Sequence, residues 1–108
     1  AASSGNSFVH ETESQVILNG SYNINFTMDL VLKDTGLFDD LAKKLNAPLE
    51  ISPKVVEIFK DGQKKYGSRA WSSMIVKRME DLNNIDFRAR GFPEELIDNE
   101  PEEKGYEI

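Results

Sequence analysis

The chain has 108 residues, of which 39% are hydrophobic and 30% charged, enough for one domain with a single core. The absence of cysteine excludes disulfides, thiolate nucleophiles and cysteine metal sites, and it fits the reducing cytoplasm that we expect as the location. Residues 1–84 carry 10 basic and 11 acidic side chains, whereas residues 85–108 carry 3 and 8, so the formal charge of −6 lies mainly in the tail. Without a basic footprint or a stretch long enough to span a bilayer, we expect no nucleic-acid and no membrane partner.

A first helix is predicted for residues Asn6–Leu18, with Ser4 or Ser7 as its N-cap and Asn19-Gly20 as its end. His10 is the only histidine of the chain, and no second ligand type stands at metal-binding spacing from it. We therefore expect His10 to be a surface residue and predict no metal site.

The strongest periodic signal predicts a long helix over Asn25–Leu45, capped by Asn25 or Thr27 and ended by Asn46-Ala47-Pro48. Its stripe repeats at helical spacing and consists of Leu30, Asp34, Leu37, Leu41 and Leu45. Gly36 lies inside this helix at a cost of about 1 kcal/mol relative to alanine, which suggests that another element packs closely there.

Asp34 occupies a position in this stripe where the periodicity favours leucine. In one interpretation the carboxylate is buried, near Lys33 and Phe26, and must be paired or hydrogen-bonded. In the other, which the pattern alone favours, Asp34 lies at the edge of the stripe and Lys33 pairs with Asp29 one turn earlier.

Two further helices complete the predicted body, which is all-helical and covers residues 1–84. Ser52 as N-cap and Pro53 at the first helical position begin the third helix, which Gly67 ends. Its apolar face consists of Val55, Val56, Ile58, Phe59 and Tyr66. The fourth helix begins at Ser68 or Ala70 and ends at Asn83-Asn84, with a stripe of Trp71, Met74, Ile75, Met79 and Leu82 that we expect in the core. Residues 85–108 are predicted to form an extended acidic tail that can lie on a surface, with mobile residues 100–105.

Residue spacing alone gives no catalytic constellation. There is no glycine-rich phosphate loop, the single histidine has no orienting partner, and the adjacent pairs Asp39-Asp40 and Glu94-Glu95 are splayed apart if helical. By composition and spacing, the chain is a helical domain without a stated function.

The order of segments resembles a known family. A short helix from Ser7, an Asn-Gly turn, the run Phe26-x7-Asp34 with Lys33, and LFDDLAKKLNAPLEISPKVVEIFKDGQKKYG (residues 37–67) are similar to the C-terminal domain of the β-hydroxyacid dehydrogenases. That family includes 3-hydroxyisobutyrate dehydrogenase and is related to 6-phosphogluconate dehydrogenase. The similarity covers about Ser4 to Leu82.

The resemblance implies an NAD(P)-dependent oxidoreductase acting on a 3-hydroxyacid or its semialdehyde. It places Lys33 at the nicotinamide cofactor and Phe26 and Asp34 along the substrate site. It implies that a Rossmann domain binds NAD or NADP, and that this domain and the catalytic lysine would precede Ala1. We therefore expect this chain alone to be inactive and to bind no cofactor.

The resemblance also implies a homo-oligomer, because the helical domain forms the dimer in that family. The first long helix of the domain would precede Ala1, so the apolar stripes need another cover and we expect self-association. Two features depart from the family: residues 67–71 read Gly-Ser-Arg-Ala-Trp without the usual acid, and the acidic tail has no counterpart. The alternative function is a stand-alone helical interaction module whose acidic tail binds a basic partner.

Overall fold

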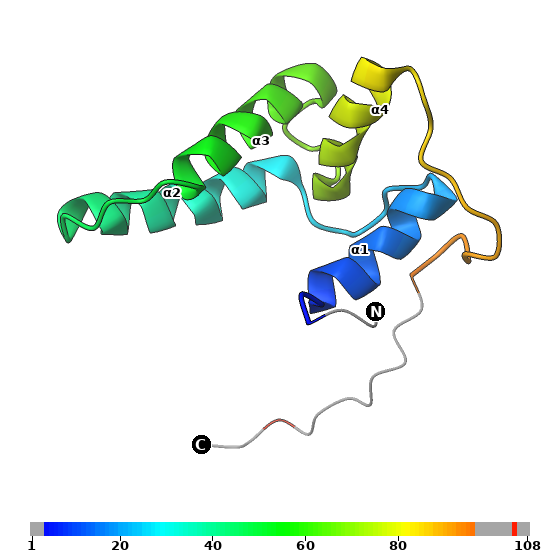
Figure 1. Cartoon of the computed structure of the whole chain (residues 1–108), viewed down its shortest axis with the longest axis horizontal. Helices are drawn as coiled ribbons and strands as arrows, with labels where there is room; N and C mark the ends of the chain where they lie inside the picture. Colours follow the sequence, from blue (N-terminus) through cyan, green and yellow to red (C-terminus); the bar gives the residue numbers. More distant parts are fainter. Residues whose placement is uncertain (1–3, 97–104, 106–108) are drawn as a thin grey trace.

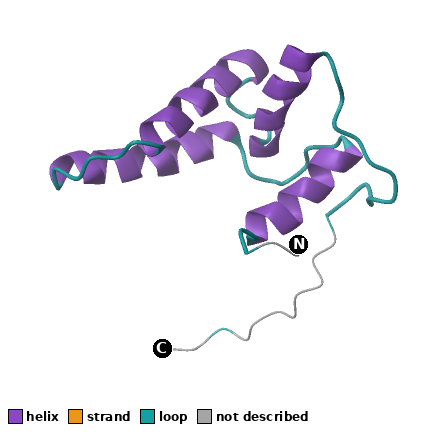
Figure 2. Ribbon diagram, in the orientation of Figure 1, coloured by secondary structure: helices purple, strands orange, loops and turns teal. Residues whose placement is uncertain are grey.

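The computed structural model describes residues 4–96 and residue 105, and it is helical, as predicted (Figures 1 and 2). The described part of the chain contains no named β-strand. Its helices are α1 (Phe8–Asn19), α2 (Met28–Lys44), α3 (Ser52–Tyr66), the 3₁₀ helix η1 (Ser72–Val76) and α4 (Lys77–Asn83). None of these helices is long and apolar enough to cross a membrane.

Helix α1 begins at Phe8, two residues later than predicted, and uses Ser7 of the two predicted N-cap candidates. The Ser7 side chain accepts a hydrogen bond from the His10 backbone N–H at 3.1 Å, and Gly20 ends the helix in the left-handed conformation at φ 83°. A Cβ atom at this position would also lie 2.5 Å from Nε of Arg88, so a side chain there would have to displace the end of Arg88. His10 is exposed, as expected.

Helices α2 and α3 form a long hairpin that projects away from α1 and α4 (Figure 1). The loop that joins them includes Asn46, in the left-handed conformation at φ 51°, and Pro48. Helix α3 begins one residue earlier than predicted, with Ile51 at the N-cap, and the Ser52 hydroxyl donates to Oδ1 of Asp39 in α2 at 2.6 Å instead of capping its own helix. Gly67 ends α3, as predicted.

The base of the hairpin is tied to the rest of the chain by backbone hydrogen bonds. Thr27 and Trp71 form an isolated antiparallel β-bridge, and the amides of Met28 and Ser72 donate to the carbonyls of Ala70 and Phe26 at 2.9 and 2.7 Å. Thr27 and Trp71 are extended and Asn25 is in the left-handed conformation at φ 56°, so α2 begins at Met28 and not at Asn25, and no helix begins at residue 68 or 70.

The predicted core stripe of the fourth helix is wrong at its C-terminal end. Met79 and Leu82 are 41% and 69% exposed, whereas Ser72, Ser73 and Glu80 are buried. The segment begins as a 3₁₀ helix, which has about 3.0 residues per turn, so the register assumed for a continuous α-helix does not hold.

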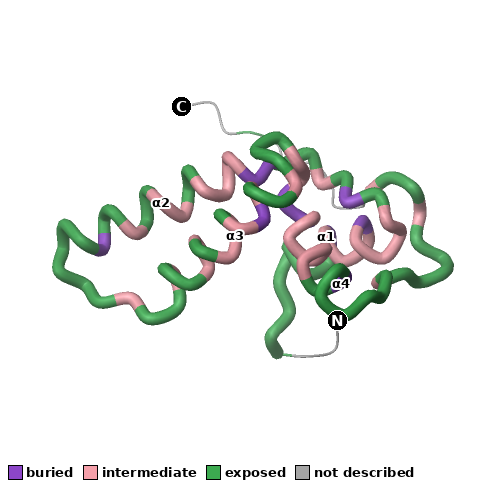
Figure 3. The backbone as a smooth tube through the Cα atoms, turned by 90° about the horizontal axis from the view of Figure 1, so that it is seen from above, coloured by how far each residue is buried: buried purple, intermediate pink, exposed green. Residues whose placement is uncertain are grey.

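The apolar stripe of α2 is largely uncovered. Leu37, Leu41 and Leu45 are 63%, 53% and 68% exposed. The more buried positions recur at helical spacing on another side of the helix: Met28, Leu32, Thr35, Asp39 and Ala42. Figure 3 shows that most fully buried residues lie where the base of the hairpin meets the other helices, and that the hairpin itself is mostly half-buried or exposed.

Close packing occurs at Gly62 in α3 and not at Gly36, which corrects the sequence prediction. A Cβ atom at Gly62 would lie 2.7 Å from Cδ1 of Ile75 and 3.0 Å from Sδ of Met28, whereas a Cβ at Gly36 meets nothing within 4 Å. Gly62 therefore lets α3 approach the start of α2 and η1.

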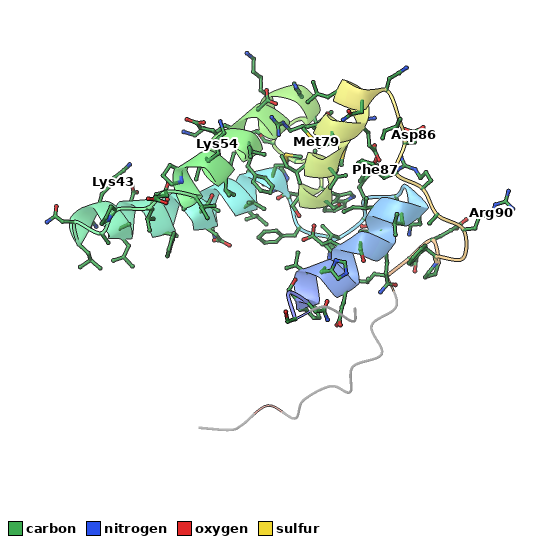
Figure 4. All side chains as sticks on the ribbon, viewed as in Figure 1. Lys43, Lys54, Met79, Asp86, Phe87 and Arg90 are labelled. Carbon is green, nitrogen blue, oxygen red and sulfur yellow. The ribbon has the colours of Figure 1, made fainter. Side chains whose placement is uncertain are left out.

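Residues 85–96 contain no helix and pass the C-terminal end of α1, with a turn at residues 90–91 (Figure 1). The Ala89 amide donates to the carbonyl of Leu18 at 3.0 Å, and Nδ2 of Asn19 donates to the carbonyl of Pro93 at 2.5 Å. Arg90 points outward from this segment (Figure 4). The tail thus lies on a surface over residues 85–96, and the predicted mobility of residues 100–105 falls outside the described residues except at residue 105.

The two helix glycines provide a matched pair of substitutions. We expect Gly36→Ala to raise the free energy of unfolding by about 0.5–1 kcal/mol, because it removes backbone entropy from the unfolded chain without a clash. Gly62→Ala should be less stable than Gly36→Ala by about 1–3 kcal/mol, because its methyl group overpacks a buried contact. Urea unfolding followed by circular dichroism measures both, and equal stabilities would contradict the close approach at Gly62.

Candidate functional site

The three residues singled out by the sequence lie at the base of the hairpin, around the first half of α2. Phe26 immediately precedes the N-cap residue Thr27, and the residue is 37% exposed. Its carbonyl accepts a hydrogen bond from the Ser72 amide at 2.7 Å. Lys33 and Asp34 lie in the second turn of α2 and are both exposed. The backbone at Phe26 is therefore fixed, while the side chains of all three residues remain accessible.

Lys33 and Asp34 form an ion pair with each other. The Lys33 Nζ lies 2.9 Å from Oδ1 of Asp34, and the two side chains are 61% and 57% exposed. Asp34 is thus not a buried carboxylate, in agreement with the interpretation that the pattern favoured. The predicted partner of Lys33 is wrong, however, because Asp29 is engaged elsewhere.

The Asp29 carboxylate is bound by other groups at the start of α2. It accepts hydrogen bonds from the Thr27 hydroxyl and from the Leu30 amide at 3.0 Å, and its Oδ2 lies 3.2 Å from Nη1 of Arg69. The Thr27 hydrogen bond, followed by Arg69, holds the pKa of Asp29 below its usual range. Asp29 is therefore occupied by the helix start and by the loop that precedes η1.

The exposed pair gives this surface a defined chemistry. An accessible ammonium can bind a phosphate or carboxylate oxygen, and an accessible carboxylate can accept hydrogen bonds from hydroxyl or amide groups. The apolar ring of Phe26 lies before the start of the same helix. Among the described residues no group of three His, Asp or Glu side chains is arranged to hold a metal ion. The surface is thus suited to contact a polar organic ligand presented by another element.

A second polar cluster is buried and was not foreseen from the sequence. Glu80 in α4 is 1% exposed, and its carboxylate accepts hydrogen bonds from the Tyr22 hydroxyl, from the Phe87 amide at 3.1 Å and from Nη1 of Arg88 at 2.8 Å. Arg88 also donates to the Tyr22 hydroxyl at 3.0 Å and lies 5.3 Å from the centre of its ring. The Ser73 hydroxyl donates to the Tyr22 carbonyl at 2.6 Å.

The electrostatics of this cluster favour the ionised carboxylate. Burial by itself raises the pKa of Glu80, but the hydrogen bonds from Tyr22, Phe87 and Arg88 outweigh it, so the pKa lies below its ordinary value of 4.5. Burial, and then the hydrogen bond to Glu80, raises the pKa of Tyr22. The Glu80 carboxylate is buried and paired on both oxygens, while the Arg88 side chain is 37% exposed, and this arrangement indicates a structural role.

No sequence signal identified the buried cluster. Tyr22 lies between the first and second predicted helices, Glu80 lies outside the predicted apolar stripe and Arg88 lies in the predicted tail. Their separations of 58 and 8 residues therefore have no periodic meaning. Gly20 is the one feature of the sequence analysis that lies against this cluster, and its close contact with Arg88 is visible only in the structure.

Comparison with known proteins shows which family this sequence matches. Residues 1–79 match the model of a family described as NAD-binding of NADP-dependent 3-hydroxyisobutyrate dehydrogenase. The chain is 31% identical over 84 residues to 2-(hydroxymethyl)glutarate dehydrogenase of Eubacterium barkeri, covering 77% of this chain and 28% of that protein. It is 30% identical over 73 residues to L-threonate dehydrogenase of Escherichia coli K12, covering 68% and 24%.

These matches concern one part of larger proteins, because the chain spans about a quarter of the length of these relatives. No solved structure matches the chain significantly. The match to the family model includes Phe26, Lys33 and Asp34, and it ends immediately before Glu80.

The buried cluster predicts a strong effect of one neutral substitution. We expect Glu80→Gln to lower the free energy of unfolding by about 1–3 kcal/mol, because the Tyr22, Phe87 and Arg88 donors lose a charged acceptor. Asp86→Asn, on an exposed residue of the adjoining segment, is the matched control and should change it little. Urea titration followed by circular dichroism measures the free energy of unfolding of both variants. Equal changes in the two would argue against a structural role for Glu80.

The loss of stability caused by Glu80→Gln should also depend on pH. Since the pKa of Glu80 is lower in the folded than in the unfolded state, its stabilisation is fully present above about 4.5 and is lost as the pH falls through the folded-state value. The stability difference between the wild-type chain and Glu80→Gln should therefore shrink in that acidic window. A difference that stays constant down to complete protonation would contradict this linkage.

The exposed pair should contribute little to folding. We expect Asp34→Ala to change the free energy of unfolding by less than about 1 kcal/mol, because an exposed ion pair is screened by water and salt. The same urea titration measures it. A loss comparable to that of Glu80→Gln would mean that Asp34 is buried in solution.

Proposed function

Because the chain belongs to the NAD-binding family of NADP-dependent 3-hydroxyisobutyrate dehydrogenase, we propose that it is the C-terminal, helical part of an NAD(P)-dependent oxidoreductase that acts on a 3-hydroxyacid or its semialdehyde. The observation that carries this proposal is the family match over residues 1–79, which includes the whole surface around Phe26 and Asp34. The names of the two relatives, both hydroxyacid dehydrogenases, support the substrate class.

In this function Lys33 contacts the cofactor, and Phe26 and Asp34 line the substrate site. The roles suit the side chains as they are placed: the Lys33 side chain is 61% exposed and its ammonium pairs with the exposed Asp34, so a cofactor oxygen can reach it. Asp34 is held beside Lys33 and can accept a hydrogen bond from a substrate hydroxyl. The ring of Phe26 provides an apolar wall on a fixed backbone and excludes water from one side.

The cofactor, NAD or NADP, supplies or accepts the hydride when it is bound. A Rossmann domain is the partner that would bind most of it, because its pyrophosphate needs a glycine-rich turn at a helix N-terminus, which residues 4–96 do not contain. Lys33 alone contributes one exposed contact, worth about 0–1 kcal/mol, so the helical chain by itself is inactive and does not retain the cofactor.

The helical part has a second role in this proposal, which is to join copies of the enzyme. The exposed stripe of α2 supports it, because an apolar helix face that no described element covers favours association. The same observation is compatible with the alternative function, a helical interaction module, which requires no contact between Lys33 and a cofactor.

A substitution at Lys33 separates these two functions. In the oxidoreductase that contains this chain, we expect Lys33→Ala to lower kcat/KM about tenfold or more, because a positioned charge at the cofactor is lost. Folding should be unaffected, since Lys33 is exposed. Lys60→Ala, an exposed lysine of α3, is the control and should retain full activity.

Steady-state kinetics with NAD⁺ or NADP⁺ and a panel of 3-hydroxyacids, and in the reverse direction with NADH or NADPH and the corresponding semialdehydes, measures both variants. If Lys33→Ala and Lys60→Ala have the same kcat/KM as the wild type, Lys33 is a surface residue and the interaction module becomes the better explanation.

A further inference from the structure

Arg69, in the loop between α3 and η1, is a basic residue at the start of α2 to which the proposed function assigns no role. The backbone on both sides of it is fixed. The Met28 amide donates to the Ala70 carbonyl at 2.9 Å. The Asp29 amide donates to the Ser68 carbonyl at 3.1 Å. These bonds also occupy the first N–H groups of α2, so an anion near this helix end has to be bound by side chains.

The Arg69 side chain is held at one point and open elsewhere. Its Nη1 lies 3.2 Å from Oδ2 of Asp29, and the side chain is 78% exposed. A guanidinium carries five N–H donors in one plane, and this contact uses one of them. Arg69 therefore keeps open a planar edge of the kind with which arginine binds a carboxylate through two parallel hydrogen bonds.

The contact with Asp29 places Arg69 on the same face of α2 as Lys33. Asp29 and Lys33 are four residues apart in this helix, so they are neighbours on one face, about 6 Å apart along the helix axis. Lys33 pairs with Asp34, and Arg69 pairs with Asp29. This face therefore presents two exposed cations about one helical turn apart. Because each already has one carboxylate partner, hydrogen-bond geometry selects a ligand here more than net charge does.

We propose that Arg69 binds a second carboxylate of the substrate, so that the preferred substrate is a dicarboxylic 3-hydroxyacid. This inference rests on the proposed function, in which Lys33 contacts the cofactor and therefore marks where the reacting carbon lies. The carboxylate that every 3-hydroxyacid carries is two bonds, roughly 2.5 Å, from that carbon. This is less than half of the helical turn of about 5.4 Å, so the group that reaches Arg69 is a carboxylate about four or five bonds away.

The side of Lys33 on which Arg69 lies favours the substrate over a cofactor phosphate as the bound anion. Arg69 lies toward the N-terminal end of α2, where Phe26 lines the substrate site in the proposed function. The two residues belong to one backbone-paired unit, because the Ser72 amide, three residues after Arg69, donates to the Phe26 carbonyl at 2.7 Å. The planar guanidinium also matches the two oxygens of a carboxylate.

A matched pair of substrates tests this assignment in the oxidoreductase that contains the chain. 2-(Hydroxymethyl)adipate carries a second carboxylate about five bonds from the reacting carbon, and 2-(hydroxymethyl)hexanoate has a methyl group in its place. The wild type should have a kcat/KM at least about tenfold higher for the dicarboxylate. Arg69→Gln should remove this preference, mainly by raising the KM of the dicarboxylate, and change kcat/KM for the monocarboxylate less than about twofold.

Two further variants make the result specific. Arg69→Lys keeps the charge but loses the planar fork, so it should retain part of the preference. Lys60→Gln removes an exposed charge of α3 and should retain all of it. Urea unfolding of each variant should match the wild type, because Arg69 and Lys60 are both exposed.

The outcomes also separate this assignment from the oxidoreductase proposal. A wild type without preference for the dicarboxylate, an equal loss of kcat/KM on both substrates in Arg69→Gln, or a rise in the KM of the cofactor alone would overturn the role of Arg69. Turnover of the monocarboxylate that depends on Lys33 would leave the oxidoreductase proposal intact in each of these cases. A wild type that turns over neither substrate would overturn both.

Discussion

The buried carboxylate of Glu80 is the constraint on which the arrangement of the helices depends. It joins α4 to the link after α1 through Tyr22 and to the C-terminal segment through Phe87 and Arg88. An unpaired buried carboxylate is costly, so all three donors must be in place together. Tyr22 even adopts the left-handed conformation, at φ 54°, which is uncommon for a bulky residue. The hydrogen bonds of its hydroxyl and carbonyl hold it there.

This cluster joins α4 to the segment after α1 and to the C-terminal segment. The α2–α3 hairpin contacts these elements only at its base. The β-bridge between Thr27 and Trp71 and the packing of Gly62 against Met28 and Ile75 fix where α2 begins. Phe26, Lys33 and Asp34 lie at this fixed base, while the apolar leucines lie toward the free end. A rigid base suits a surface that must meet a ligand in one geometry, and an uncovered end suits association.

The family match suggests a chemistry for the surface around Lys33 and Asp34, which the geometry of the described residues does not. The exposed Lys33–Asp34 pair is, by itself, an ordinary surface ion pair, because neither burial nor a metal cluster distinguishes it. The match to a family of NAD-binding dehydrogenases gives this surface a chemical context. The same match ends at residue 79, so Glu80 and Arg88 of the buried cluster lie outside the residues that match the family model.

The sequence by itself determined the helical class, the end of α1 at Gly20, the end of α3 at Gly67, the exposure of His10 and the family, because these depend on local periodicity, backbone conformation and linear order. It left Ser4 and Ser7 as alternative N-caps of α1, and the structure selects Ser7. Only the tertiary structure decided that the Leu37 stripe stays uncovered, that Gly62 and not Gly36 is the close contact, and that Lys33 pairs with Asp34. It also brought Tyr22, Glu80 and Arg88 together. The physical reason is that each of these outcomes depends on which neighbour fills the space beside a residue. Elements distant in sequence supply those neighbours, and local periodicity carries no information about them.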